Sequence, residues 1–149
     1  MRPEGRPRLA PPRRRSLGHL DLYAEAADQI DLTVRDVRAL SRAALSVVQP
    51  GAPSPEPLSG AVRDLARATE ALAVYLETPG DPEDTRRLAL EASREASALL
   101  NDREELASNL AVNALVDQIH SSSVDLLGST GMDRGKALQA LEEATGRAS

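Results

Sequence analysis

A three–four spacing of apolar and small residues runs through residues 17–48 and constrains the fold more than any other feature of the sequence. The positions are Leu20, Tyr23, Ala27, Ile30, Val34, Val37, Ser41, Ala44 and Val48. Residues at alternating steps of three and four form one narrow stripe on an α-helix. Such a stripe requires neighbouring helices to cover it. The pattern therefore predicts one long amphipathic helix with antiparallel partners.

The opposite side of this helix is charged. Its residues are Asp21, Glu25, Asp28, Asp31, Arg35, Asp36, Arg38 and Arg42. Asp31 and Arg35 stand at the i,i+4 spacing, at which opposite charges attract by a few tenths of a kcal/mol. We expect these side chains to face solvent.

Local signals predict four further helices. Prolines 50, 53 and 55 end the first helix, and a second covers about residues 56–77. Its inner stripe is Leu58, Val62, Leu65, Thr69, Leu72 and Leu76. Asp81 is the expected N-cap of a third helix, which has Pro82 at its first position and runs to about Leu100. Its inner stripe is Leu88, Ala92, Ala96 and Leu99.

A fourth helix is expected over about residues 103–130, capped by Asn101 and Asp102 and ended by Gly131 in a left-handed conformation. Its inner stripe is Val112, Leu115, Val116, Ile119, Ser122, Ser123, Leu126 and Leu127. Asp133 then caps a short last helix that Gly146 ends, with Met132 packing against Ala137. The sequence thus predicts an all-α fold over residues 17–149: an antiparallel four-helix bundle with a short fifth C-terminal helix.

The composition limits both the core and the chemistry. The chain has 149 residues, of which 41% are hydrophobic, and it has no Phe, Trp or Cys. Its core must be built from Leu, Val, Ile and many alanines, which predicts closely approached helices and a surface that needs a partner. The absence of Cys excludes disulfides and thiol chemistry and fits a reducing, cytoplasmic compartment. No apolar run reaches the roughly 20 residues of a membrane-spanning helix.

Residues 1–16 are rich in Pro and Arg, with six arginines and one glutamate. Having little to bury, they are expected to form a disordered basic leader ahead of an acidic body. A solvated leader is the simplest interpretation. Contact of Arg13, Arg14 and Arg15 with anionic lipid is the sharper one. The acidic body and the scarcity of aromatic residues argue against a nucleic-acid partner.

The sequence offers few candidates for catalysis. His19 and His120 are its two histidines, and His120 precedes Ser121, Ser122 and Ser123. Successive helical residues point in different directions, so these serines cannot all converge on the imidazole. Asp117 and His120 supply one half of the paired motif that a di-metal bundle requires. We therefore expect no catalytic, metal-binding or cofactor-binding residues and interpret this pair as polar surface neighbours; a metal-dependent bundle enzyme is the minor alternative.

Two polar residues of the expected fourth helix have a structural interpretation. Asn109 and Asn113 stand four residues apart, where their side chains share one face. We expect them to hydrogen-bond across a helix interface and so to fix its register.

Two stretches resemble a known family. Residues 113–127 followed by 129–133, and residues 21–31 followed by Val34, Arg35 and Arg38, are similar to the C-terminal soluble region of bacterial fusaric-acid-resistance (FUSC) and aromatic acid exporter-type membrane proteins. The first stretch carries the family-like motif, which consists of Asp117, Gln118, Ile119, His120, Asp125, Leu126, Thr130, Gly131 and Asp133. The resemblance covers most of residues 17–145 loosely, and it includes no catalytic motif.

This resemblance implies a non-enzymatic cytosolic helical domain with an assembly or regulatory role near the inner membrane face. Residues 1–149 contain none of the membrane helices of that family, so the chain is either a part of such a protein or an accessory subunit. The alternative is a soluble helical adaptor whose apolar stripe binds a second copy or a partner helix.

Overall fold

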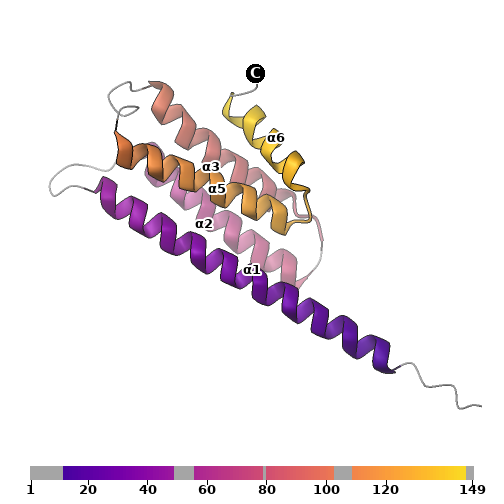
Figure 1. The fold of residues 1–149 in the computed structure, drawn as a ribbon. Coiled ribbons are helices and arrows are strands. Elements are labelled where there is room, and N and C mark those ends of the chain that lie inside the picture. Colours follow the sequence, from indigo (N-terminus) through magenta and orange to yellow (C-terminus); the bar gives the residue numbers. More distant parts are fainter. Residues whose placement is uncertain (1–11, 49–55, 79, 103–108, 147–149) are drawn as a thin grey trace, which may run out of the picture.

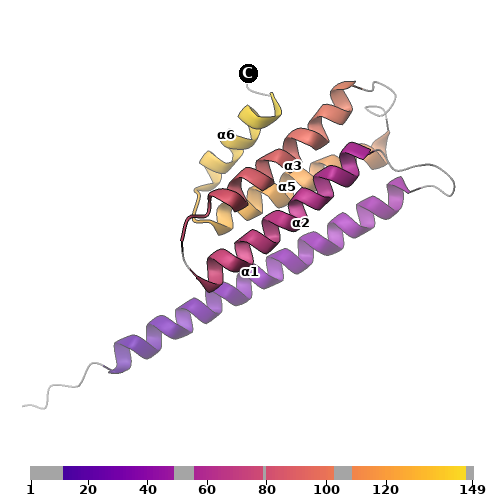
Figure 2. The same ribbon diagram turned by 180° about the vertical axis from the view of Figure 1, so that it is seen from behind.

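The structure is a computed structural model that describes residues 12–48, 56–78, 80–102 and 109–146, without the side chains of residues 12–27, 29, 30 and 102. Five helices and no strand lie in these ranges: α1 Pro12–Val47, α2 Glu56–Glu77, α3 Glu83–Asp102, α5 Leu110–Ser129 and α6 Arg134–Thr145. Successive helices run in opposite directions along the bundle (Figures 1 and 2). The predicted all-α antiparallel bundle with a short last helix is confirmed.

Three helices form the centre of the bundle. α2, α3 and α5 pack against one another, α6 covers α3 and α5, and α1 lies against α5. Among the described residues, α1 and α2 are not in close backbone contact, although both border α5. One side of the four-helix arrangement is therefore open.

Small residues allow the central helices to approach closely. Ala61 and Ala68 of α2 and Ala89, Ala92 and Ala96 of α3 have no exposed surface. Larger buried side chains from α2 and α5 fill the remaining space, namely Leu58, Leu65, Leu72, Val112, Leu115, Val116, Ile119, Leu126 and Leu127. Burying each Leu or Val contributes roughly 1.5–3 kcal/mol, so the core depends mainly on these few side chains.

The predicted inner stripe of α5 is confirmed, since all eight of its positions are buried. The stripe of α2 is only partly right. Val62 and Leu76 are 38% and 48% exposed, and Ala61 and Ala68 take the buried positions instead. α2 turns its small residues towards α3, which leaves Val62 on the open side of the bundle.

Most helix ends follow the predicted signals. Asp81 Oδ1 accepts a hydrogen bond from the Glu83 N–H (3.1 Å), and Asp133 Oδ1 accepts one from the Gly135 N–H (2.9 Å). Gly131 and Gly146 have φ of 81° and 70°, the left-handed conformation expected after a helix. The predictions for Asp133, Gly131 and Gly146 are confirmed. Asp81 makes the predicted capping hydrogen bond, but α3 begins at Glu83, so Pro82 precedes the helix and is not its first residue.

The predicted start of the fourth helix is wrong. Asn101 and Asp102 form the last turn of α3, and α5 begins at Leu110 with Asn109 as its N-cap. Asn109 Oδ1 accepts hydrogen bonds from the N–H groups of Ala111 (3.0 Å) and Val112 (3.3 Å). This side chain therefore caps its own helix and is not the expected bridge across an interface, and Asn113 Nδ2 donates to the Asn109 carbonyl of the same turn.

The first helix differs most from expectation. It begins at Pro12 and not at Leu17, so residues 12–16 are helical, while residues 1–11 of the predicted leader lie outside the described residues. Its packed face is also shifted. Leu40, Ala43, Ala44 and Val47 contact the core, whereas Val34, Val37 and Val48 are 41%, 55% and 58% exposed. Most of the packed positions precede the predicted ones by one residue, a rotation of about 100° about the helix axis.

Candidate functional site

An apolar groove occupies the open side of the bundle. It has a volume of about 310 Å³ and lies between α1 and α2, with α5 as its floor. Its apolar lining comes from Val37, Leu40 and Ala44 of α1, Val62, Leu65 and Ala66 of α2, and Leu126 of α5. We call this feature, with these residues, the docking groove. Its size and lining fit a binding site for apolar side chains.

Polar groups are few in the docking groove. Thr33, Asp36 and Ser41 of α1, Thr69 of α2 and Ser122 of α5 also line it. Two of these hydroxyls are used within their own helices, since Ser41 donates to the Val37 carbonyl (2.7 Å) and Thr69 to the Leu65 carbonyl (2.9 Å). The described lining therefore presents mainly hydrocarbon surface with one carboxyl group, that of Asp36.

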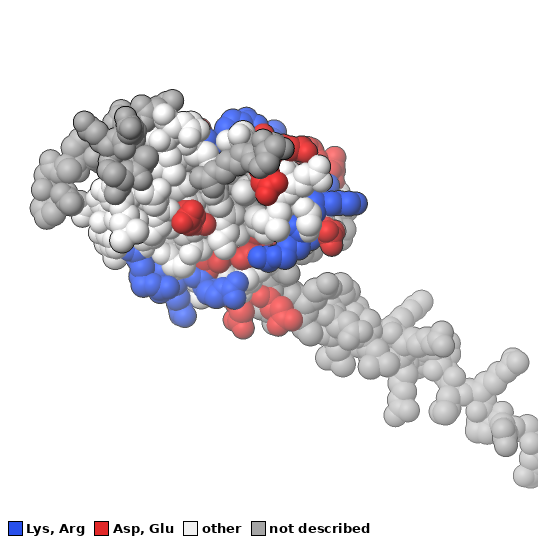
Figure 3. All heavy atoms as spheres, turned by 45° about the horizontal axis from the view of Figure 1, so that its top comes forward, with Lys and Arg blue, Asp and Glu red and all other residues white. Residues whose placement is uncertain are grey.

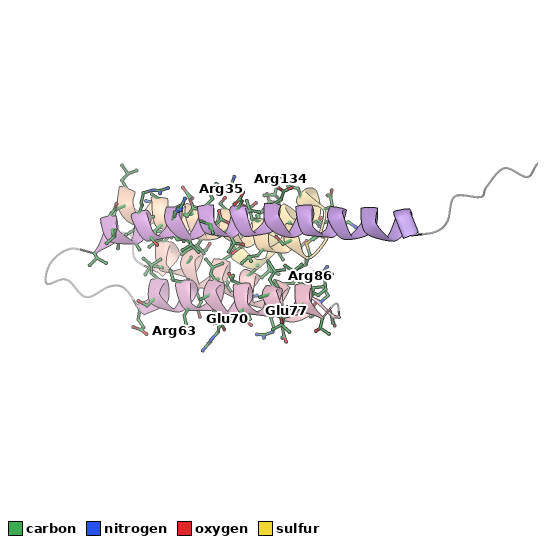
Figure 4. The ribbon with its side chains drawn as sticks, turned by 90° about the horizontal axis from the view of Figure 1, so that it is seen from below. Arg35, Arg63, Glu70, Glu77, Arg86 and Arg134 are labelled. Atoms are coloured by element: carbon green, nitrogen blue, oxygen red, sulfur yellow. The ribbon has the colours of Figure 1, made fainter. Side chains whose placement is uncertain are left out.

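Apart from Asp36, the charged residues near the docking groove stand along its edges. Figure 4 shows α1 and α2 side by side, with Arg35 on the edge of α1 away from α2. Arg63 and Glu70 lie along the opposite edge, beside α2.

Figure 3 shows another face, on which basic and acidic groups alternate around the edge with no large patch of one sign. The docking groove, by contrast, has an apolar centre between charged edges. An apolar centre with a charged rim is the usual composition of a protein–protein contact.

Asp36 is the one ionisable group among the described residues that line the docking groove. Burial raises its pKa above the ordinary value of 3.8, the nearby Asp125 carboxylate raises it further, and Arg35 partly offsets both effects. Arg35 Nη2 lies 3.6 Å from Asp125 Oδ2, so this arginine bridges α1 to α5. The expected exposure of Arg35 is confirmed at 68% of its side chain, whereas Asp36 is half-buried and not on a solvated face.

The exposed stripe of α1 continues the apolar surface. Val34, Val37 and Val48 are the predicted stripe positions left uncovered, and Leu45 is 75% exposed beside them. Val37 and Ser41 belong both to this stripe and to the wall of the docking groove, which Ala44, packed against the core, also lines. Three of the positions that predicted helix packing, Val34, Val37 and Val48, are thus exposed in the described structure.

The histidine of α5 lies inside the bundle. His120 is 8% exposed, and its Nε2 is 2.9 Å from the Oγ of the buried Ser97 on α3. Asp117 is exposed, so the expectation of a polar surface pair is wrong for His120. Sequence reasoning missed Ser97 because it is 23 positions away, on another helix.

A second polar contact joins the same two helices. Ser93 Oγ donates to Ser123 Oγ (2.8 Å), which donates to the Ala89 carbonyl (2.9 Å). Ser93, Ser97, Ser123 and His120 are all buried, and none of them borders a described pocket. We interpret these contacts as fixing the register of α3 against α5.

The last residues of the family-like motif form the corner between α5 and α6. Arg86 of α3 donates from Nε to Thr130 Oγ1 (2.9 Å) and from Nη2 to the Thr130 carbonyl (3.1 Å). Gly131 then supplies the left-handed turn, and Asp133 begins α6. Ile119 and Leu126 are buried, Gln118 is half-buried, and Asp125 pairs with Arg35. The motif residues with described contacts thus act in the core, in an ion pair or at the corner between α5 and α6.

The remaining predicted site residues bring no cluster together. Arg13, Arg14 and Arg15 belong to the first turns of α1, and their side chains lie outside the described part. Over residues 12–146, with the gaps given above, no three His, Asp or Glu side chains are grouped as metal ligands. In the same part of the chain, every helix is too short or too polar to cross a bilayer.

No protein-family model, no curated protein and no solved structure matches this chain. The docking groove and the exposed stripe of α1 are the features of the described structure that bear on function.

Proposed function

We propose that this chain is a non-enzymatic helical interaction domain whose docking groove binds an amphipathic helix. The observation that carries the proposal is the uncovered stripe of α1 beside the groove. An apolar helix face exposed to water lowers solubility unless another surface covers it. A helix laid between α1 and α2 would close the open side of the bundle.

Site-specific photo-crosslinking in the cells that produce the protein tests this proposal. A photoreactive amino acid at position 37 is the probe, because Val37 is exposed and lines the groove. The same amino acid at position 117, on the exposed side of α5, is the matched control. We expect a defined adduct, identified by mass spectrometry, from position 37 only. Equal adducts from both positions, or none from either, would contradict the proposal.

A second candidate function follows from the family resemblance. We propose that the domain works at the cytoplasmic face of the inner membrane, as the soluble region of a fusaric-acid-resistance or aromatic acid exporter-type protein would. The sequence stretches that end at Asp133 and the run Arg13–Arg15 support this candidate. A basic segment gains about 1 kcal/mol per Lys or Arg near anionic lipid.

Vesicle co-sedimentation tests the membrane candidate. The full chain is compared with a variant in which Arg13, Arg14 and Arg15 are replaced by Gln. We expect the parent chain to sediment with anionic vesicles at low salt and to be released at high salt, and the variant to bind less. Equal binding of both proteins, or no effect of salt, removes this candidate and leaves the interaction domain untouched.

A further inference from the structure

We propose that the docking groove is filled by a second copy of this chain. In this arrangement the two α1 helices lie antiparallel, and residues 16–30 of each copy lie against residues 34–48 of the other. The inference rests on the proposed function and names the partner of the same groove. Four observations lead to it: the length of α1, its stripe, its charges and the position of the bundle along it.

The length of α1 supplies the occupant. Leu32 borders a pocket with Gly128, Ser129 and Met132, at the end of α5. α1 extends from there back to Pro12, and Figures 1 and 2 both show this half running past the end of the other helices. Residues 12–30 thus form a helical arm attached to a body that has an open groove.

The stripe of α1 supplies the register. Eight of its nine positions, all but Val48, are symmetric about Leu32, so an antiparallel copy places Leu20 opposite Ala44, Tyr23 opposite Ser41, Ala27 opposite Val37 and Ile30 opposite Val34. In heptad terms each a position meets a d position, as an antiparallel coiled coil requires. Val37, Ser41 and Ala44 are also the groove wall, so the arm that covers the stripe enters the groove.

The charges of α1 favour the antiparallel direction. Asp21, Glu25, Asp28 and Asp31 precede the centre of symmetry, and Arg35, Asp36, Arg38 and Arg42, with one acid among three bases, follow it. An antiparallel pair therefore brings the mainly acidic half of one helix near the mainly basic half of the other, although most of these positions lie on the side of the helix away from the stripe. A parallel pair in register would align acid with acid and base with base, which is unfavourable.

The position of the bundle also favours this direction. The body packs against α1 from about Leu32 to Val47, which is one half of the helix. Antiparallel pairing places the two bodies at opposite ends of the paired helices, whereas parallel pairing would crowd them at one end. The contact is two-fold symmetric and closes at two copies, because each arm fills the other groove.

Disulfide trapping tests the inference, and the absence of native Cys leaves only introduced thiols. Full-length Ile30→Cys and Val34→Cys are mixed in equal amounts and oxidised under mild conditions. A mixture of Ile30→Cys and Ser46→Cys is the control, because Ser46 is exposed and outside the stripe. Circular dichroism checks that each variant keeps the helical content of the parent chain.

We expect the disulfide between positions 30 and 34 to be the dominant product, with little product from the control mixture or between identical variants. Homodisulfides of Val34→Cys as the main product would overturn the antiparallel arrangement. Absence of any stripe disulfide would overturn the second copy as occupant. If position 37 then forms a photo-adduct with another protein, the docking groove remains a binding site for a helix of that protein. If that adduct is also absent, both proposals are wrong.

Discussion

Ser97 of α3 and His120 of α5 lie 2.9 Å apart, Oγ to Nε2, in the interior of the bundle. This contact and the one between Ser93 and Ser123 place polar pairs in an otherwise aliphatic interface. A buried polar pair forms its hydrogen bond in only one register of the two helices, whereas contacts between Ala and Leu side chains can form in several registers. We interpret the pair as a determinant of the α3–α5 register.

Replacing Ser97 tests this role. Ser97→Ala should lower the free energy of unfolding by about 1–3 kcal/mol, because the buried imidazole nitrogen loses its hydroxyl partner. Urea unfolding followed by circular dichroism measures the change. Ser121→Ala, on the exposed side of α5, is the control and should have little effect. Equal stability of both variants would show that the Ser97 contact contributes nothing.

The link between Arg86 and Thr130 makes a second prediction. Arg86→Ala should destabilise the protein by about 1.5–3 kcal/mol, because two hydrogen bonds from a charged donor to the α5–α6 corner are lost. Its neighbour Arg87 pairs only with residues of its own helix among the described contacts, and it is exposed. Arg87→Ala should therefore cost much less than Arg86→Ala, because its ion pairs are exposed to solvent. A larger loss for Arg87→Ala than for Arg86→Ala would refute this ranking.

Replacing two glycines of the same corner by alanine should change the free energy of unfolding in opposite directions. Gly131 has φ of 81°, so Gly131→Ala forces a side chain into the left-handed region and should cost about 1–2 kcal/mol. Gly128 lies in α5 with open space around the position of a Cβ atom. Gly128→Ala should therefore stabilise the protein by roughly 0.5–1 kcal/mol. Thermal unfolding of the two variants measures both signs, and changes of the same sign would contradict the assigned conformations.

Asp36 makes stability depend on pH. Its pKa is raised in the folded protein, so the folded state binds this proton more tightly than the unfolded state does. The corresponding stability is present below the ordinary pKa of 3.8 and is lost as the pH rises through the higher folded value. Asp36→Asn should therefore be more stable than the parent chain at neutral pH, and its stability should vary less with pH.

Urea unfolding at several pH values above the ordinary pKa of Asp36 measures this effect. Asp117→Asn removes an exposed carboxyl group and is the control. A neutral-pH stability of Asp36→Asn below that of the parent would mean that the attraction to Arg35 outweighs burial and the repulsion from Asp125.

Capping and turn residues in the sequence predicted most helix ends correctly, whereas the apolar pattern did not predict which face of a helix packs against the core. Asp81, Asp133 and Gly131 act within a few residues of themselves, so their roles could be predicted from sequence. The packed stripe of α1 could not, because the apolar positions one residue earlier, Leu40 and Val47, satisfy the same spacing. The tertiary structure decided that those positions meet the core and left Val37 outside.

The buried histidine and the docking groove were missed for the same reason. A His among serines is typical of a surface, and nothing near His120 in the sequence points to Ser97. The groove exists because α1 and α2 stand apart while both border α5, a spacing that no single helix encodes. Its residues could be named only as parts of separate stripes.

Sedimentation velocity of the full chain tests the central claim most directly, namely that the exposed stripe of α1 joins two copies of this chain. The parent chain should sediment as a dimer, and Val37→Asp as a folded monomer. Val74→Asp, a substitution at a 66% exposed apolar residue outside the docking groove, should remain a dimer. A parent chain that stays monomeric at every concentration, or a Val37→Asp variant that remains dimeric, would contradict the account.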